Sequence, residues 1–299
     1  MQVTPCAAWA DRLEFVGDYD RPVASVGVLP IRLLAEKLGL RAALSAAWAR
    51  RGFTPVYDRG QLAVDLALTL LAGGEAISDF QGLRHLAPVT GPVASTPTVW
   101  RLLDEAGEET LAGLNRAVAA FRRRWWGLLA ARPEGFPWLT VAGKELTGIT
   151  VVDMDASLVF SRSGNKEQAA ATYKGGVGFA PNLATCDNTD DLLVIDPRPG
   201  NATSNDATDN IATLTRAVER IPGAFRHRLL IRLDGAGFSH ELLTHIASGG
   251  GKRGRRWEFS VGWPRTDREM TAIGKLPARH GPRRSSRTAP RSTTRSSPS

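Results

Sequence analysis

The amino-acid sequence predicts an α/β protein in which an all-helical N-terminal region precedes a mixed, five-stranded sheet. Leucines at a spacing of three to four residues dominate the first 133 residues. Beyond a stretch that contains proline and glycine, at 133–148, short β-branched runs replace this pattern. We therefore expect a helical region at 1–133, a sheet domain at 134–277 and an Arg/Ser/Pro tail at 278–299.

Helix signals divide the N-terminal region into several segments. Leucine-rich helices are expected near 29–40, ended by Gly39, and at 62–71, ended by a pair of glycines. Ser95 and Pro97 provide a capping hydroxyl and a first-turn proline, so a helix should begin there. Further helices are expected at 75–86 and 108–129. The segments between 62 and 103 are candidates for a helix-turn-helix that contacts DNA ends, although no glycine turn marks one.

The order of the later elements predicts the topology of the sheet. Strands are expected at 149–160, 176–187, 191–196, 229–233 and 257–263, and helices at 205–220 and 238–246. Three successive strands can pair as an antiparallel meander, and a helix then returns the chain for a parallel strand. If the fourth strand lies beside the first, the order is 3-2-1-4-5. This layout resembles the ribonuclease H-like fold, although ferredoxin-like folds and fragments of doubly wound sheets share parts of it.

Charge and cysteine content restrict the setting of the protein only loosely. The net charge is +8, but six arginines lie in 277–299, where no acid occurs, and removing their charge leaves +2. Overall charge is therefore weak evidence for a nucleic-acid partner. The two cysteines, Cys6 and Cys186, can form at most one disulfide, so we expect a cytoplasmic location. The longest apolar stretch, Leu66 to Ala72, is too short for a membrane span, and no membrane partner is expected.

Three aspartates are candidates for a metal site. Asp153 and Asp155 lie two residues apart in the first expected strand, so their side chains leave the same face. Asp234 ends the fourth strand, and neighbouring strands would bring these carboxylates together. Carboxylates in close proximity need a cation, and hard oxygen ligands suit Mg²⁺ or Mn²⁺. The alternative is structural: Asp153 lies on a half-solvated strand and Asp234 caps the following helix.

Five successive blocks of sequence resemble one family of DNA-recombining enzymes. The blocks are DMDASLV, AATYKGGVGFAPNLATCDN, RPGNATSNDATDNI, LIRLDGAGFSHELL and WEFSVGW. They are similar to the DDE transposases of bacterial insertion-sequence family thirteen-eighty, the group-one DDE transposase domain. The resemblance implies a ribonuclease H-like domain that cuts and rejoins transposon ends with Mg²⁺ (or Mn²⁺) held by Asp, Asp and Glu. It assigns the catalytic, metal-binding aspartates to Asp155 and Asp234, with Asp153 as the runner-up for the first.

The third carboxylate has no clear counterpart. In the family this glutamate lies on a helix well past the fifth strand, whereas the last acid here is Glu269. The segment after residue 277 consists mainly of Arg, Ser, Pro and Thr. Such a composition is typical of a translated frameshift and offers too little apolar surface to fold. A genuine basic DNA-binding tail is the alternative. We therefore expect a shortened, inactive transposase, or alternatively a non-catalytic DNA-binding remnant.

Basic residues suggest where DNA would be contacted. Arg122, Arg123 and Arg124 precede two tryptophans, a combination found on nucleic-acid surfaces, although it also suits the end of an amphipathic helix. Lys174 in the second block is a further candidate. The resemblance implies double-stranded DNA partners, namely transposon ends and target DNA, together with nucleoid association, and it allows a homodimer.

Overall fold

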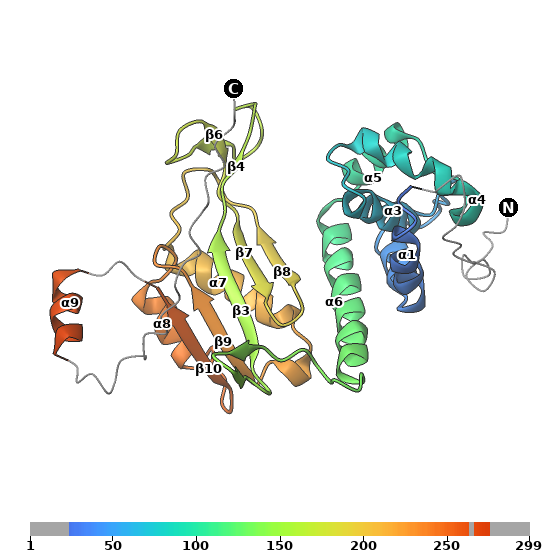
Figure 1. The fold of residues 1–299 in the computed structure, drawn as a ribbon. Coiled ribbons are helices and arrows are strands. Elements are labelled where there is room, and N and C mark those ends of the chain that lie inside the picture. Colours follow the sequence, from blue (N-terminus) through green and yellow to red (C-terminus); the bar gives the residue numbers. More distant parts are fainter. Residues whose placement is uncertain (1–23, 263–265, 276–299) are drawn as a thin grey trace, which may run out of the picture.

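The computed structural model describes residues 24–262 and 266–275, and it contains a helical N-terminal region beside a mixed sheet (Figure 1). The predicted mixed α/β class is confirmed. The expected tail at 278–299 lies outside the described residues. The N-terminal elements are α1 (Val28–Lys37), α2 (Leu40–Ala47), α3 (Arg59–Leu71), the 3₁₀ helix η2 (Ile77–Leu86), α4 (Ala87–Thr90), α5 (Thr96–Asp104) and α6 (Glu108–Ala130).

Local signals account for most of these helix boundaries. Gly39 has φ +74°, a left-handed conformation that suits glycine, and it separates α1 from α2. The carboxylate of Asp58 accepts a hydrogen bond of 2.7 Å from the backbone N–H of Gln61 and caps α3. The segment expected as a helix from residue 75 begins instead at Ile77, because Asp79 accepts hydrogen bonds from the backbone N–H groups of residues 75 and 76, and it is a 3₁₀ helix.

One apolar cluster holds the helical region together. Its buried side chains come from α1 to α6 and include Leu62, Phe80 and Val99. α2 and α3 approach closely because Gly60 faces the backbone of Arg41 without a side chain between them. α6 continues past this cluster, and its C-terminal half contributes to the core of the sheet domain. The helix therefore belongs to both regions.

The main sheet has five strands in the order β10-β9-β3-β7-β8. β9 pairs in parallel with β3 and β10, whereas β7 pairs antiparallel with β3 and β8. Counted along the chain, the order is 3-2-1-4-5, as the element order predicts. The strands are β3 (Thr150–Ala156), β7 (Asn182–Cys186), β8 (Asp191–Asp196), β9 (Arg228–Leu233) and β10 (Arg256–Val261).

Two expected strands are divided between sheets. The first continues into β4 (Val159–Phe160), and the second begins as β6 (Val177–Phe179); both join β5 (Ala170–Ala171) in a separate three-stranded sheet. The second strand breaks at Ala180, whose backbone N–H and C=O both bond to Arg198 instead of to a neighbouring strand. A hairpin of β1 (Thr140–Val141) and β2 (Lys144–Glu145) was not expected from the sequence.

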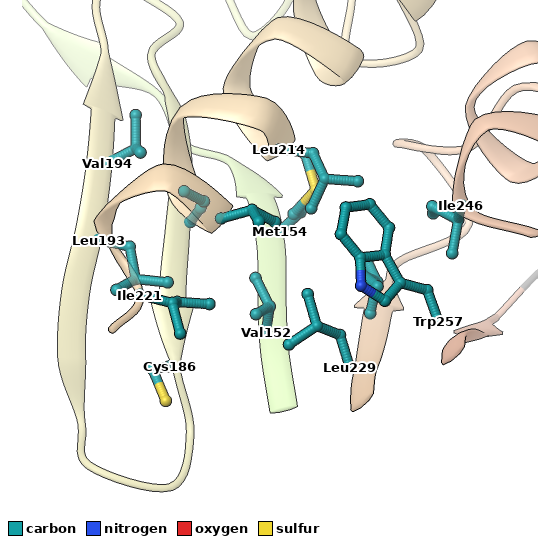
Figure 2. Packing of buried hydrophobic residues seen from close by; sticks show 14 of the residues in the cluster. Val152, Met154, Cys186, Leu193, Val194, Leu214, Ile221, Leu229, Ile246 and Trp257 are labelled. Carbon is teal, nitrogen blue, oxygen red and sulfur yellow. The ribbon is translucent and has the colours of Figure 1, made fainter. Parts of the chain in front are cut away.

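Helices cover one face of the main sheet. α7 (Ala207–Arg220) and α8 (His240–Ala247) bury Leu214 and Ile246 against Val152 and Leu229 of the strands (Figure 2). Because side chains alternate along a strand, Asp153 and Asp155 of β3 lie on the other face. Arg232, which is opposite Asp153 on β9, lies on that face as well. α9 (Asp267–Gly274) follows β10 and has no buried residue.

Candidate functional site

Asp155 and Asp234 lie at the same end of two adjacent parallel strands. In the register of β3 and β9, Asp153 is opposite Arg232 and Met154 is opposite Leu233. One further step along both strands leads to Asp155 and Asp234, and both residues are exposed. The topology therefore brings Asp155 and Asp234 to the same end of the sheet, at the carboxyl ends of its central strands.

The carboxylate of Asp234 is held by the loop that follows β9. Its Oδ1 accepts hydrogen bonds from the backbone N–H groups of Ala236, at 3.1 Å, and Gly237, at 2.8 Å. Asp155 has a looser arrangement, because its Oδ1 accepts only from the N–H of the next residue, Ala156, at 2.8 Å. Oδ2 of each aspartate takes part in none of the hydrogen bonds found among the described residues.

Asp153 is bound by an arginine. Both of its oxygens accept hydrogen bonds from Arg232, which also donates to Asp187 Oδ2 at 2.6 Å. The hydrogen bond to Asp153 is the main reason why the pKa of Arg232 is raised above its usual value, and the nearby charge of Asp187 adds to it. Arg232 therefore offsets the negative charge on Asp153, whereas Asp155 forms no ion pair within the described part of the chain.

Among the residues that the structure describes, no third carboxylate joins the two exposed aspartates. In residues 24–262 and 266–275, no group of three or more His, Cys, Asp or Glu side chains could hold a metal ion. Glu241 lies in the first turn of α8, and Glu258 lies on β10. Glu269 caps α9, where its Oε2 accepts from the backbone N–H of Thr266 at 2.9 Å.

The basic residues proposed for DNA contact lie in different environments. Arg122 is 4% exposed, forms an ion pair of 3.2 Å with Asp191, and donates to the carbonyl of Leu192. It thus connects α6 to the sheet, an environment that does not favour the DNA contact expected of it, and that contact stays a prediction. Arg123 is exposed, whereas Arg124 donates to the carbonyl of Leu38 at 2.5 Å.

Lys174 lies in the turn between β5 and β6. Its Nζ lies 5.7 Å from the ring centroid of Tyr173, which is 81% exposed. The small sheet that carries this turn lies beyond the end of β3 at which Asp155 is placed (Figure 1). A cation and an exposed aromatic ring thus belong to the small sheet that lies beyond the end of β3 where Asp155 is placed.

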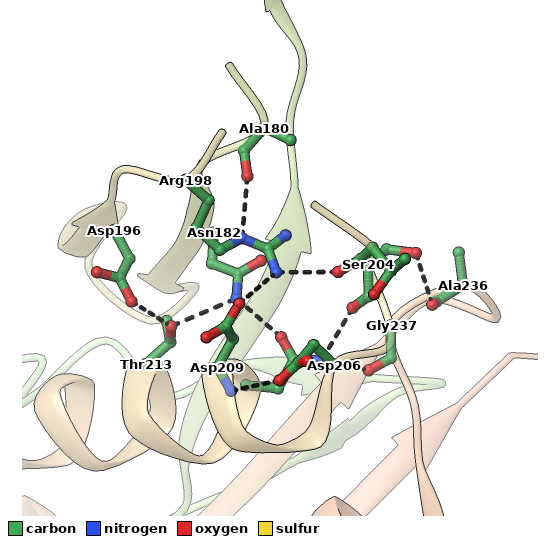
Figure 3. A network of polar contacts seen from close by, with 12 residues as sticks. Ala180, Asn182, Asp196, Arg198, Ser204, Asp206, Asp209, Thr213, Ala236 and Gly237 are labelled. Carbon is green, nitrogen blue, oxygen red and sulfur yellow. Dashed lines mark hydrogen bonds and ion pairs between the residues drawn. The ribbon is translucent and has the colours of Figure 1, made fainter. Parts of the chain in front are cut away.

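A buried polar network that sequence reasoning missed lies next to Asp234. Figure 3 shows it between the loop after β8, the start of α7 and the loop after β9. Asn210 is its central residue, and Arg198 holds the loop by donating to Thr203 O and Asp209 Oδ2. The available signal was the polar pair Asn210 and Thr213, at helical spacing on the face of α7 that packs on the sheet.

The sequence as a whole identifies the class of protein to which this fold and these acids belong. Residues 12–292 match the family described as "Transposase DDE domain group 1", so the chain belongs to this family. The match includes residues 278–292 and so gives no support to the expectation that these residues are out of frame. A search of curated proteins finds no match. None of the helices in the described part of the chain is long and apolar enough to cross a membrane.

Proposed function

We propose that the protein is a DNA transposase whose sheet domain is ribonuclease H-like and whose Asp155 and Asp234 hold Mg²⁺ or Mn²⁺. The observation that carries the proposal is the parallel pairing of β3 and β9, which ends at Met154 and Leu233 and is followed directly by Asp155 on β3 and by Asp234 after β9. The family match over residues 12–292 and the strand order 3-2-1-4-5 support it. Association with the nucleoid follows from a DNA substrate.

The donor set fits a hard divalent cation. Both side chains are exposed carboxylates, and oxygen ligands are those that Mg²⁺ and Mn²⁺ prefer. Backbone N–H groups bind Oδ1 of each aspartate and leave Oδ2 available for an ion. The ion pair with Arg232 favours Asp155 over Asp153 as the ligand on β3, because Asp153 already has a cationic partner.

The protein's own residues would bind and orient the DNA. A bound divalent ion stabilises the negative charge that develops on a reacting phosphate and promotes attack by water or a 3′-hydroxyl. Asp155 and Asp234 would place the scissile phosphate at this end of the sheet. Lys174 offers a cation for the DNA backbone and Tyr173 a surface for stacking, both in the small sheet beyond the end of β3. Arg123 is a further exposed cation.

We propose that these residues alone do not complete strand cleavage. Two aspartates supply a charge of −2, whereas a pair of divalent ions carries +4, so a third acid would be needed to hold the second ion. The glutamates nearest to Asp234 in the sequence are the candidates for this third ligand, and they lie elsewhere in the fold. Glu269 caps α9, and Glu241 and Glu258 lie on α8 and β10. The expected state is one that binds a metal ion and DNA but is deficient in cleavage. A DNA-binding remnant without metal affinity is the alternative.

A strand-cleavage assay and a metal titration test this proposal together. The chain is incubated with duplex oligonucleotides that carry the element's end, in Mg²⁺ and in Mn²⁺, while Mn²⁺ binding is measured separately. Binding without cleavage is the expected result. Cleavage would disprove the deficiency, and Glu241→Gln, Glu258→Gln and Glu269→Gln would then identify the third ligand. Absence of Mn²⁺ binding would support the remnant instead.

Transposition joins two DNA ends, so we propose that two copies of the chain act together. Light scattering of the chain with and without end-bearing DNA measures the stoichiometry. A complex with two chains is expected, and a strictly monomeric complex would contradict the proposal.

A further inference from the structure

We infer that Asn210 is a positioning residue, which holds the loop after β9 so that Asp234 presents Oδ2 to the metal ion. This inference rests on the proposed function, because it takes Asp234 as a ligand. Asn210 is 4% exposed and lies in the first turns of α7, separated from Asp234 in the sequence but adjacent to its loop.

Every polar atom of the Asn210 side chain has a partner. Nδ2 donates to the carbonyl oxygens of Ser204 and Gly237, both at 2.9 Å. Oδ1 accepts from Nδ2 of Asn182 on β7, also at 2.9 Å. A buried amide with all its hydrogen bonds satisfied has one preferred orientation, because any rotation would leave buried groups unpaired. Asn210 therefore connects the loop after β8 and the loop after β9 to the central sheet.

The bond to Gly237 acts directly on the loop that orients Asp234. The carbonyl of Gly237 is held by Asn210, while the N–H of the same residue donates to Asp234 Oδ1 at 2.8 Å. Ser204 provides a second connection, since its Oγ donates to the carbonyl of Ala236 at 2.8 Å. The N–H of Ala236 also donates to Asp234 Oδ1, at 3.1 Å. The two amides that hold the carboxylate thus belong to residues whose carbonyls are held by Asn210 and Ser204.

The space around the loop is tight enough for this positioning to matter. A methyl group added at Gly237 would lie 3.2 Å from Asp234 Oδ1. Small shifts of the loop would therefore move the carboxylate. Metal ligands depend on such support, because neighbouring hydrogen bonds set the direction in which a carboxylate oxygen points, and their loss typically weakens metal binding by about 10- to 100-fold.

The test compares Asn210→Ala with Thr215→Val in the full-length chain. Thr215 is an exposed residue on the same helix whose hydroxyl donates only within α7, to the carbonyl of Ile211, so it is a matched control. Mn²⁺ binding is followed by the electron paramagnetic resonance signals of free and bound Mn²⁺, and amide hydrogen exchange of residues 234–238 is measured without metal. Thermal unfolding shows whether each variant is folded.

We expect Asn210→Ala to weaken Mn²⁺ binding about tenfold, to alter the bound Mn²⁺ spectrum and to speed amide exchange at residues 236 and 237. Thr215→Val should change none of these. A folded Asn210→Ala chain with the Mn²⁺ affinity and loop exchange of the control would overturn the inference.

Two other outcomes are also decisive. If the unaltered chain binds no Mn²⁺, the proposed function fails, and amide exchange at residues 236 and 237 still decides whether Asn210 holds the loop. If Asn210→Ala does not fold, Ser204→Ala replaces it, because that variant removes only the hydroxyl bond to Ala236. Faster loop exchange and weaker Mn²⁺ binding in Ser204→Ala would then support the positioning role, and unchanged values would overturn it.

Discussion

The helical region and the carboxyl ends of β3 and β9 use their charged residues in opposite ways. In the helical region, Arg32 and Asp65 are 3.5 Å apart with side chains only 4% and 6% exposed, and the buried Arg59 pairs with Glu105 at 2.8 Å. In the sheet domain, Asp155 and Asp234 are exposed at the ends of strands. Buried ionic groups favour one arrangement of packed helices, whereas exposed, uncompensated carboxylates remain available to a ligand. The difference indicates that the helical region is a structural scaffold, whereas the carboxyl ends of β3 and β9 are the part available to a ligand.

The largest loss of stability is expected from a substitution in α6, the helix that belongs to both regions. Trp126 is fully buried, lies 5.1 Å from the Phe225 ring and 5.2 Å from the Phe136 ring, and donates from Nε1 to Asp191 Oδ2 at 2.7 Å. Trp126→Ala should lower the free energy of unfolding by about 3–5 kcal/mol. Chemical denaturation measures the loss, and Trp126→Phe, which keeps a ring, should lose clearly less. Equal losses would show that the aromatic contacts contribute little.

The buried acid of the helical region should give that region its own pH dependence. Burial raises the pKa of Asp65 to about 6, in spite of the opposing charge of Arg32. Because the pKa in the folded state is raised, the folded state binds the proton more tightly. The resulting stabilisation is present below about pH 4 and is lost as pH rises through about 6.

Comparison with Asp65→Asn isolates this effect from other titrations. The unfolding free energy of the unaltered chain, minus that of the variant, should fall by about 2 kcal/mol between pH 4 and pH 7. A difference that stays constant, or that grows with pH, would mean that Arg32 outweighs burial and that the carboxylate is an ordinary salt-bridge partner.

The close approach of α2 and α3 gives a smaller expected effect. A methyl group at Gly60 would lie 2.2 Å from the carbonyl oxygen of Arg41 and 2.5 Å from the backbone nitrogen of Ser45. Gly60→Ala should therefore destabilise the chain by about 1–3 kcal/mol, although alanine favours helices. Gly127→Ala in α6, where nothing lies within 4 Å, is the control and should be neutral or stabilising. Thermal unfolding of both variants makes the comparison, and a stabilised Gly60→Ala would refute the tight contact.

The sequence was sufficient for features that depend on local patterns. The helix limit at Gly39, the order of strands, and the placement of aspartates at the ends of two of them follow from periodicity, glycine conformation and chain connectivity. A helix does begin directly after Ser95, but the expected cap is absent, because the Ser95 hydroxyl bonds to the hydroxyl of Thr98 and makes no cap hydrogen bond to the backbone. Features that depend on distant partners were not predictable. Arg122 meets Asp191 across 69 residues, and Arg232 meets Asp153 across 79. Neither partner can be inferred from spacing, so an arginine expected at DNA proved to be buried, and the ion pair that separates Asp153 from Asp155 was not foreseen.

The most direct test of the central claim is the Mn²⁺ affinity of four full-length chains, measured at the same pH: the unaltered chain, Asp155→Asn, Asp234→Asn and Asp153→Asn. The changes at 155 and 234 are expected to abolish binding. Asp153→Asn should retain it within about threefold, because Arg232 and not the metal is the partner of Asp153. Loss of binding in Asp153→Asn with retention in Asp155→Asn would contradict the account and transfer the metal site to the other aspartate.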